Sequence, residues 1–227
     1  MGDVISVVPS KYDRIFEVFA DSYLDTIKAP AIVVDDGLSR TIKQKYSMFR
    51  YIESPKPFAF CLSVNAGIIA AGGADILLFN DDCYIHTKEA DKILHNGAYS
   101  DKRIGLVAPM MTNVQNRDQL VSDVKSAGVF ITKNNITFVC VYMKRSIITE
   151  VGLLDEEYRH GVADREDIDY CVRVRQAGYE LGISPTCFVE HGGSRFGRTI
   201  SNTRFLEGQM ELAHRNREYF TRKWGHG

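Results

Sequence analysis

The chain has 227 residues, of which 44% are hydrophobic and 25% charged, with a formal net charge of -1. This composition predicts a globular protein with one well-filled core, and the balanced charge argues against a dedicated nucleic-acid-binding surface. Five scattered cysteines without a C-x-x-C pair argue against a zinc site and suit reduced thiols in the cytosol, and no apolar run is long enough to span a membrane.

The first half of the sequence alternates apolar runs with a helical segment. Nearly continuous apolar runs predict buried parallel strands at residues 4–8, 31–36, 58–63 and 75–80. Between the first two strands, residues 13–27 place apolar side chains at helical spacing. This βαβ pattern predicts a parallel sheet covered by helices.

The second half has a more mixed pattern. A helix is predicted at 164–177, with Asp164 as its N-cap and Gly178 as its stop. The glycine-rich, polar segment 192–203 predicts a mobile loop. The other expected elements are strands at 103–111, 136–145, 180–185 and 187–193, a short helix after residue 145, and a C-terminal helix within 201–227.

Each of three predicted strands ends in polar residues. In open α/β sheets, ligands bind beyond the carboxyl ends of the strands, so these endings are expected to line one crevice. They are Pro9 and Ser10, Asp35 and Asp36, and Asn80 to Asp82.

The acidic pair at the end of the fourth predicted strand is the most informative of these endings. Asp81 and Asp82 are adjacent and repel each other unless a cation or a donor offsets their charge. Carboxylate oxygens suit Mg²⁺ or Mn²⁺ bound together with substrate phosphates. A solvated turn explains the same residues, and the pair alone leaves both interpretations open.

Two further segments carry titratable groups. Glu166 and Asp167 lie in the first turn of the helix expected at 164–177, where acids are favoured by the helix dipole. A carboxylate there could also act as a general base toward an acceptor hydroxyl, and spacing alone does not choose. His191 ends a predicted strand and is either an ordinary hydrogen-bonded residue or a metal ligand.

The order of these segments resembles that of the family 2 glycosyltransferases of the GT-A fold, particularly bacterial and phage rhamnosyl- and galactofuranosyltransferases. The matching segments are "VISVVPSKYDR", "IVVDDGLSR", "VNAGIIAAGGADILLFNDDC", "VYMKRSIITEVGLLDEEY", "EDIDYCVRVRQAGY", "FVEHGG" and "NREYFTRKWG". The resemblance implies one Rossmann-like GT-A α/β domain over 1–227, with a central, mostly parallel sheet flanked by helices. Within it, 1–110 would form the nucleotide-sugar half, 111–200 the acceptor and catalytic half, and 201–227 the C-terminal helix.

The resemblance also implies roles for single residues. Asp167 matches the family's catalytic base, and Asn80 replaces the first acid of its D-x-D motif. The implied metal ligands are Asp82 and His191. The implied nucleotide-binding residues are Pro9, Ser10, Asp35, Asp36, Asn65, Gly67 and Asp81. The residues themselves suggest second-tier candidates: Glu166 and Asp169 as alternative bases, and Arg195 or Arg198 as positive charges if the loop at 193–203 closes over the diphosphate. Asn80 is also second-tier.

The function implied is inverting, metal-dependent transfer of a sugar from a nucleoside-diphosphate sugar to an acceptor hydroxyl. A UDP-sugar donor is favoured, with Mn²⁺ or Mg²⁺ as cofactor. The sequence does not choose between a glycan, a lipid-linked precursor, a protein and a modified DNA base as the acceptor, and it leaves the oligomeric state open. The expected location is the cytoplasm, including the membrane periphery. Two alternatives remain: a non-catalytic sugar-nucleotide-binding module, suggested by Asn80, and a nucleotidyltransferase, for which a glycine-rich phosphate loop is missing.

Overall fold

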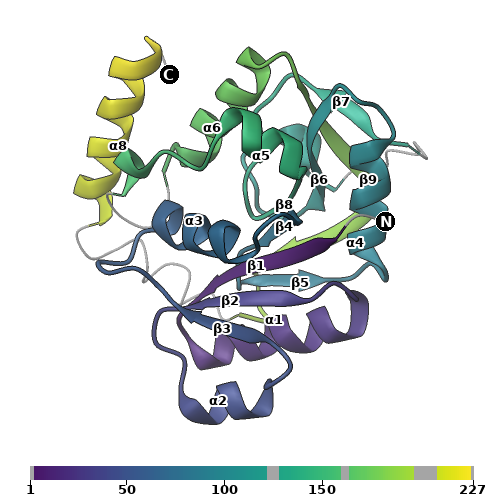
Figure 1. Ribbon diagram of the computed structural model, residues 1–227, viewed down its shortest axis with the longest axis vertical. Coiled ribbons are helices and arrows are strands. Elements are labelled where there is room, and N and C mark those ends of the chain that lie inside the picture. Colours follow the sequence, from purple (N-terminus) through teal and green to yellow (C-terminus); the bar gives the residue numbers. More distant parts are fainter. Residues whose placement is uncertain (1–2, 122–127, 160–163, 197–208, 226–227) are drawn as a thin grey trace.

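A computed structural model describes residues 3–121, 128–159, 164–196 and 209–225. Within these ranges the protein is a mixed α/β domain whose central sheet has the strand order β3-β2-β1-β4-β8-β6-β9-β5, with β7 also pairing β9. Helices α1, α2 and α4 cover one face of the sheet, and α3, α5 and α6 cover the other, with α8 against α6 at the outer edge (Figure 1).

The strands are β1 (Val4–Ser10), β2 (Ala31–Asp35), β3 (Arg50–Glu53), β4 (Asp75–Phe79), β5 (Cys83–Ile85), β6 (Ile104–Met111), β7 (Phe130–Thr132), β8 (Cys140–Met143) and β9 (Glu180–His191). The α-helices are α1 (Asp13–Thr26), α2 (Arg40–Lys45), α3 (Phe60–Ala70), α4 (Ala90–Tyr99), α5 (Arg145–Val151), α6 (Glu166–Gln176) and α8 (Gln209–Trp224). Two short 3₁₀ helices are η1 (Arg117–Gln119) and η2 (Glu156–Tyr158).

The expected parallel pairing is confirmed in the first half of the sheet. Strand β1 lies parallel to β2, with Ser10 opposite Asp35, and parallel to β4 on its other side. The carboxyl ends of these three strands therefore meet at one edge of the sheet. The second half is mixed, because β8 runs antiparallel to both β4 and β6, so the sheet is less parallel than predicted.

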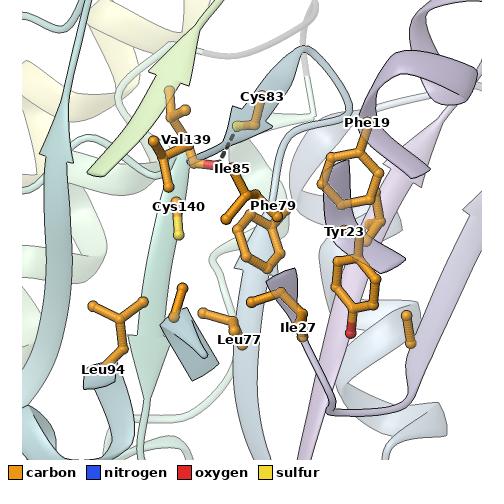
Figure 2. Packing of buried hydrophobic residues seen from close by; sticks show 14 of the residues in the cluster. Phe19, Tyr23, Ile27, Leu77, Phe79, Cys83, Ile85, Leu94, Val139 and Cys140 are labelled. Atoms are coloured by element: carbon orange, nitrogen blue, oxygen red, sulfur yellow. Dashed lines mark hydrogen bonds between the residues drawn. The ribbon is translucent and has the colours of Figure 1, made fainter. Parts of the chain in front are cut away.

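One core lies between β4 and α1 (Figure 2). The rings of Phe19 and Tyr23 on α1 pack against Phe79 at the end of β4, with centroids 5.6 and 6.0 Å apart. Behind them, the Cys83 thiol donates to the carbonyl of Val139 at 3.4 Å. These contacts make the end of β4, which leads into Asp81 and Asp82, a rigid part of the molecule.

The strand predicted at 58–63 is wrong, because helix α3 begins at Phe60. A short apolar run fits a buried helix as well as a buried strand, since periodicity cannot separate them. The third parallel strand is instead β3, a half-exposed edge strand that pairs with β2. Its sequence, "RYIE", lacks the continuous apolar character of the strands predicted as buried.

Three further expectations are corrected. Strand β9 is one continuous strand with a register shift opposite β6, in place of two strands at 180–185 and 187–193. Strand β8 covers only Cys140–Met143 of the predicted 136–145. The N-cap of α6 is Arg165, in a left-handed conformation, and Asp164 pairs with Arg217 at 2.6 Å.

The predicted end of α6 is confirmed. Gly178 ends α6 with a φ of +87°, a conformation that favours glycine. All five cysteines are free and buried. In the described part of the chain, no helix combines the length and the apolar character needed to cross a bilayer.

Candidate active site

The polar ends of β1, β2 and β4 meet, as the sequence predicts. The Ser10 hydroxyl donates to Asp81 Oδ2 at 2.6 Å, in a buried position. The backbone N–H of Asp36 donates to the Ser10 carbonyl at 2.8 Å. Ser10, the last residue of β1, therefore joins the endings of its two neighbouring strands.

The adjacent carboxylates of Asp81 and Asp82 contact different partners. Asp81 is buried beside Ser10. Asp82 is half-buried, and its Oδ1 lies 3.6 Å from Nε2 of His191. The pairing of β5 with β9 holds the two side chains together, because Cys83 lies opposite His191. Asp81 thus contacts the end of β1, whereas Asp82 faces a histidine at the end of β9.

The imidazole of His191 is oriented from its other nitrogen. Nδ1 lies 3.0 Å from the carbonyl oxygen of Asn113, which has no proton to donate, so Nδ1 carries the hydrogen. Burial lowers the pKa of His191, but the hydrogen bond to Asp82 and the negative charge of that carboxylate outweigh it, and the net pKa is raised. Nε2 therefore faces a carboxylate that attracts a proton or a metal cation.

The residues present fit the divalent cation that the sequence predicts. Two ligands that each lie about 2.1 Å from one ion are separated by roughly 3 to 4 Å, which includes the distance between Asp82 and His191. In addition, Oδ1 of Asn80 is buried and has no hydrogen-bond partner within the described parts of the chain. Among the described residues there is no group of three or more His, Cys, Asp or Glu that could hold a metal. Two protein ligands leave the remaining positions to phosphate and water, as is usual for Mg²⁺.

Asp35 and Asp36, at the end of β2, are both paired with lysines. Asp35 accepts from the N–H groups of Gly37 and Leu38 at 2.8 and 2.7 Å and from Lys43 at 2.7 Å. Burial raises the pKa of Asp35, but these donors outweigh it and lower the net pKa.

The side chain of Asp36 is 2% exposed and lies between two ammonium groups. Lys11 approaches Oδ2 at 3.0 Å, and Lys56 contacts Oδ1. The two lysines are far more exposed than the carboxylate that they cover. The sequence does not predict that these lysines pair with Asp36. The pairing arises because the loops after β1 and β3, which carry Lys11 and Lys56, meet at the end of β2.

Asn65 and Gly67 lie on α3 and are engaged in packing. Asn65 bonds in both directions with the backbone of Leu154, at 2.9 and 3.0 Å. A Cβ atom on Gly67 would lie 2.2 Å from Val7 Cγ1, so this glycine lets α3 approach β1 closely. Their predicted contact with a nucleotide stays a prediction, and the structure supplies another reason for both residue types.

Asp167, in the first turn of α6, lies beside the end of β4. Its carboxylate accepts the N–H groups of Phe138 and Ile168. Val139, which follows Phe138 in the chain, accepts the N–H of Asn80 at 2.8 Å through its carbonyl oxygen. One short segment before β8 therefore holds both Asp167 and the acidic loop. Burial, only partly offset by the backbone donors, raises the pKa of Asp167 to about 6.

The two acids that flank Asp167 have different environments. Glu166 is 3% exposed, and its Oε2 has no hydrogen-bond partner in the ranges that the structure describes. Burial raises the pKa of Glu166 well above the usual range. Asp169 is fully buried and bonds to Arg173, Lys223 and Trp224 at 2.8, 2.7 and 2.8 Å. Asp169 thus joins α8 to α6, and its carboxylate is engaged by these three side chains.

Arg195 lies just after β9, near the acidic loop. Its guanidinium bonds to Glu190 at 3.2 Å and lies 4.3 Å from the ring centroid of Tyr84. Arg198, together with residues 197–203 of the predicted mobile loop, lies outside the described residues.

No protein-family model matches the chain, and no curated protein matches it. Among solved structures, it is similar to the crystal structure of GalNAc-T7 with UDP, GalNAc and Mn²⁺, with a TM-score of 0.69 at 12% sequence identity. The match covers 85% of this chain and 44% of that one, so this chain spans less than half of the neighbour's length. This similarity shows the fold: the described residues form a mixed α/β domain with a central sheet flanked by helices, which matches the GT-A-like fold of that neighbour.

Proposed function

We propose that this protein is a glycosyltransferase that moves a sugar from a nucleoside-diphosphate sugar to an acceptor hydroxyl. The observation that carries the proposal is the convergence of three groups at the carboxyl edge of a GT-A sheet. These are the Ser10–Asp81 hydrogen bond, the Asp82–His191 pair, and Asp167, which is held by the segment that also holds Asn80. The similar GalNAc-T7 structure contains UDP and Mn²⁺, which supports the same donor class and cofactor here.

Asp82 and His191 are the residues proposed to hold Mn²⁺ or Mg²⁺. When bound, the cation offsets the negative charge that develops on the diphosphate as the glycosidic bond breaks. The buried amide oxygen of Asn80, which has no hydrogen-bond partner among the described residues, is a third group beside this site. An amide oxygen suits Mg²⁺ and Mn²⁺ as a ligand, so Asn80 in place of an acid is compatible with a working site.

Asp167 is proposed as the general base. Its carboxylate removes the proton of the acceptor hydroxyl while that oxygen bonds to the anomeric carbon. The bond from this carbon to the diphosphate oxygen breaks with its electron pair on the leaving group. A single in-line displacement of this kind inverts the anomeric centre. With a pKa raised to about 6, Asp167 is ionised at neutral pH and still a better base than an ordinary aspartate.

The loops after β1 and β2 are proposed to hold the nucleoside. Ser10 is anchored to Asp81, and Asp36 lies between Lys11 and Lys56. The exposed lysines can move aside while the buried carboxylate stays in place, so Asp36 remains a fixed acceptor for a nucleoside N–H or hydroxyl. UDP is the favoured nucleotide, and the family 2 assignment, which depends on the ordered sequence motifs, is part of the proposal.

Calorimetry with UDP tests the donor site directly. We expect UDP to bind more tightly with Mn²⁺ than with a chelator, because a cation held by Asp82 and His191 would offset the charge of the phosphates. Asp82→Ala should remove this gain, whereas Asp118→Ala, a change at η1 away from the proposed ligands, should retain it. Equal UDP affinities for the wild-type protein with and without Mn²⁺ would count against the metal site.

A non-catalytic sugar-nucleotide-binding module is the second candidate, favoured by Asn80 in place of an acid. Both functions predict binding of a donor, so only product formation separates them. The assay supplies a UDP-sugar, Mn²⁺ and a panel of glycan, lipid-linked, peptide and nucleic-acid acceptors, and detects the glycosylated product. Tight donor binding without any product across the panel, and without donor hydrolysis, would support the module.

A further inference from the structure

The carbonyl group that orients His191 belongs to a residue with an uncommon backbone conformation. Asn113 follows β6 and has a φ of +53°. Residues other than glycine seldom adopt this left-handed conformation, and asparagine is among those that tolerate it best. Asn113 is solvent-exposed, so packing of its side chain in the core does not explain the conformation. Its consequence is that the carbonyl oxygen of Asn113 faces His191 Nδ1 at 3.0 Å.

Three further hydrogen bonds join the same two segments. The backbone N–H of His191 donates to Thr112 Oγ1 at 2.9 Å, and that hydroxyl lies 3.3 Å from the His191 carbonyl, to which it donates. The Asn113 side chain donates to the same carbonyl at 2.8 Å. The pairing of β6 with β9 ends at Met111, so these bonds extend the contact beyond the sheet. We call Thr112 and Asn113 the 112–113 clasp.

The clasp fixes which nitrogen of His191 is available. A hydrogen on Nδ1, required by the Asn113 carbonyl, leaves the lone pair of the neutral ring on Nε2. Nε2 lies 3.6 Å from Asp82 Oδ1, another acceptor. When Nε2 carries no proton, it and the carboxylate are two acceptors that face each other, which is the arrangement expected of two metal ligands.

We propose that Asn113 is a positioning residue for the metal site. Its left-handed backbone holds His191 in the tautomer and ring orientation that direct Nε2 toward Asp82. The inference rests on the proposed glycosyltransferase function for the identity of the ion, but the tautomer is a property of the protein alone. Asn113 lies in the segment "MTNV", which has no sequence pattern that marks it as part of a site.

Two substitutions separate the carbonyl from the side chain. In Asn113→Val, a β-branched residue disfavours positive φ, so the carbonyl is expected to turn away from Nδ1. In Asn113→Gly, the left-handed backbone remains accessible and only the side-chain bond is lost. Glu89→Val is the matched control for strain, because Glu89 has a φ of 55° just before α4, a helix that contacts the same two strands, β6 and β9.

The first measurement is the tautomer of His191 in the metal-free protein, by nitrogen-15 NMR of the histidine rings at a pH where the ring is neutral. His191→Gln identifies the signal. We expect the hydrogen on Nδ1 in the wild-type protein and in Asn113→Gly, and a mixture of tautomers in Asn113→Val. A wild-type signal with the hydrogen on Nε2 would overturn the inference, as would an Asn113→Val signal identical to the wild type.

The second measurement is the gain in UDP affinity given by Mn²⁺. Loss of a group that orients a metal ligand typically costs about 10- to 100-fold in metal affinity, so Asn113→Val should reduce the gain by about tenfold or more. Asn113→Gly should lose less, and Glu89→Val should match the wild type, with circular dichroism showing that each variant is folded. If Mn²⁺ gives the wild-type protein no gain, the proposed metal site fails while the NMR result still decides the tautomer. If the wild type shows the gain and Asn113→Val keeps all of it, the inference fails and the proposed function stands.

Discussion

At the scale of single residues, Asp167 is the clearest test of catalysis against helix capping. Asp167→Asn keeps the size of the side chain but cannot accept a proton from the acceptor, so turnover should fall by about 10²-fold or more. UDP binding should be unchanged. The measurement is product formation with a real acceptor, since donor hydrolysis by water does not require the same base.

A matched control is available in the same segment. Asp164 also precedes α6, but its carboxylate pairs with Arg217 at 2.6 Å, whereas the carboxylate of Asp167 accepts the N–H of Phe138. Asp164→Asn should therefore leave turnover close to that of the wild type. Near wild-type turnover in Asp167→Asn would instead point to the neighbouring, buried Glu166 as the group to substitute next.

The raised pKa of Asp167 also predicts the pH dependence of the reaction. The base works only when it is ionised, so kcat/KM should fall as the pH drops through about 6. An ordinary aspartate, with a pKa of about 3.9, would keep the rate constant down to roughly pH 5. Initial rates between pH 5 and 8 distinguish the two, with UDP binding measured in parallel to exclude loss of donor at low pH.

At the scale of secondary-structure elements, Gly67 tests how closely α3 packs on the sheet. A Cβ atom there would lie 2.2 Å from Val7 Cγ1 and 3.2 Å from Val34 Cγ2. Gly67→Ala should therefore reduce the free energy of unfolding by about 1 to 3 kcal/mol, the usual cost of overpacking. Gly73→Ala is the control, because no atom lies within 4 Å of the added Cβ.

Urea unfolding of the two glycine variants gives the comparison. Equal stability of Gly67→Ala and Gly73→Ala would contradict the packing explanation. If Gly67→Ala is less stable but its folded form binds UDP like the wild type, Gly67 is a packing residue and its predicted contact with the nucleotide is wrong.

Helix α8 provides a second prediction at this scale. Lys223 bridges Asp155 and Asp169 at 2.6 and 2.7 Å, and Asp169 is fully buried. Lys223→Met removes the charge but keeps most of the apolar stem, which leaves a buried carboxylate with one cation fewer. We expect a loss of about 2 to 4 kcal/mol in the free energy of unfolding, reduced from the range for a fully buried pair because Lys223 is partly exposed.

The control for Lys223 is its neighbour Arg222, which is exposed. Arg222→Met should change the free energy of unfolding by less than about 0.5 kcal/mol, as is usual for exposed sites. Both variants are measured by urea unfolding at one pH and ionic strength. A small effect at Lys223 would show that α8 is held by its apolar contacts, through residues such as Phe220, and not by this ion pair.

At the scale of the whole molecule, binding of the donor should stabilise the native state. A ligand present at about 100 times its Kd adds roughly 2.7 kcal/mol to the free energy of unfolding. We therefore expect a higher melting temperature with UDP and Mn²⁺ together than with either alone. In Asp82→Ala the combination should give no more than UDP alone, and a full shift in that variant would exclude Asp82 as a metal ligand.

The whole fold also shows why some elements could be predicted and others not. Strands β1, β2 and β4 are buried on both faces, so their sequences are continuously apolar and they are recognised from sequence. Strand β3 is an edge strand, and α3 is an apolar helix, and neither has the periodicity that would identify it. The strand predicted at 58–63 fails for this reason.

The sequence by itself determined the α/β class, the strand endings, the acidic pair at 81 and 82, and the placement of Asp167 at the start of a helix. These features depend on local patterns of apolar, polar and turn residues, which the chain carries in order. Only the tertiary structure decided that Asp81 bonds to Ser10 while Asp82 faces His191, that Lys11 and Lys56 enclose Asp36, and that Asn113 orients the histidine. Such contacts join residues far apart in the chain, because strand order and register bring them together, and neither leaves a signal in the spacing of residues.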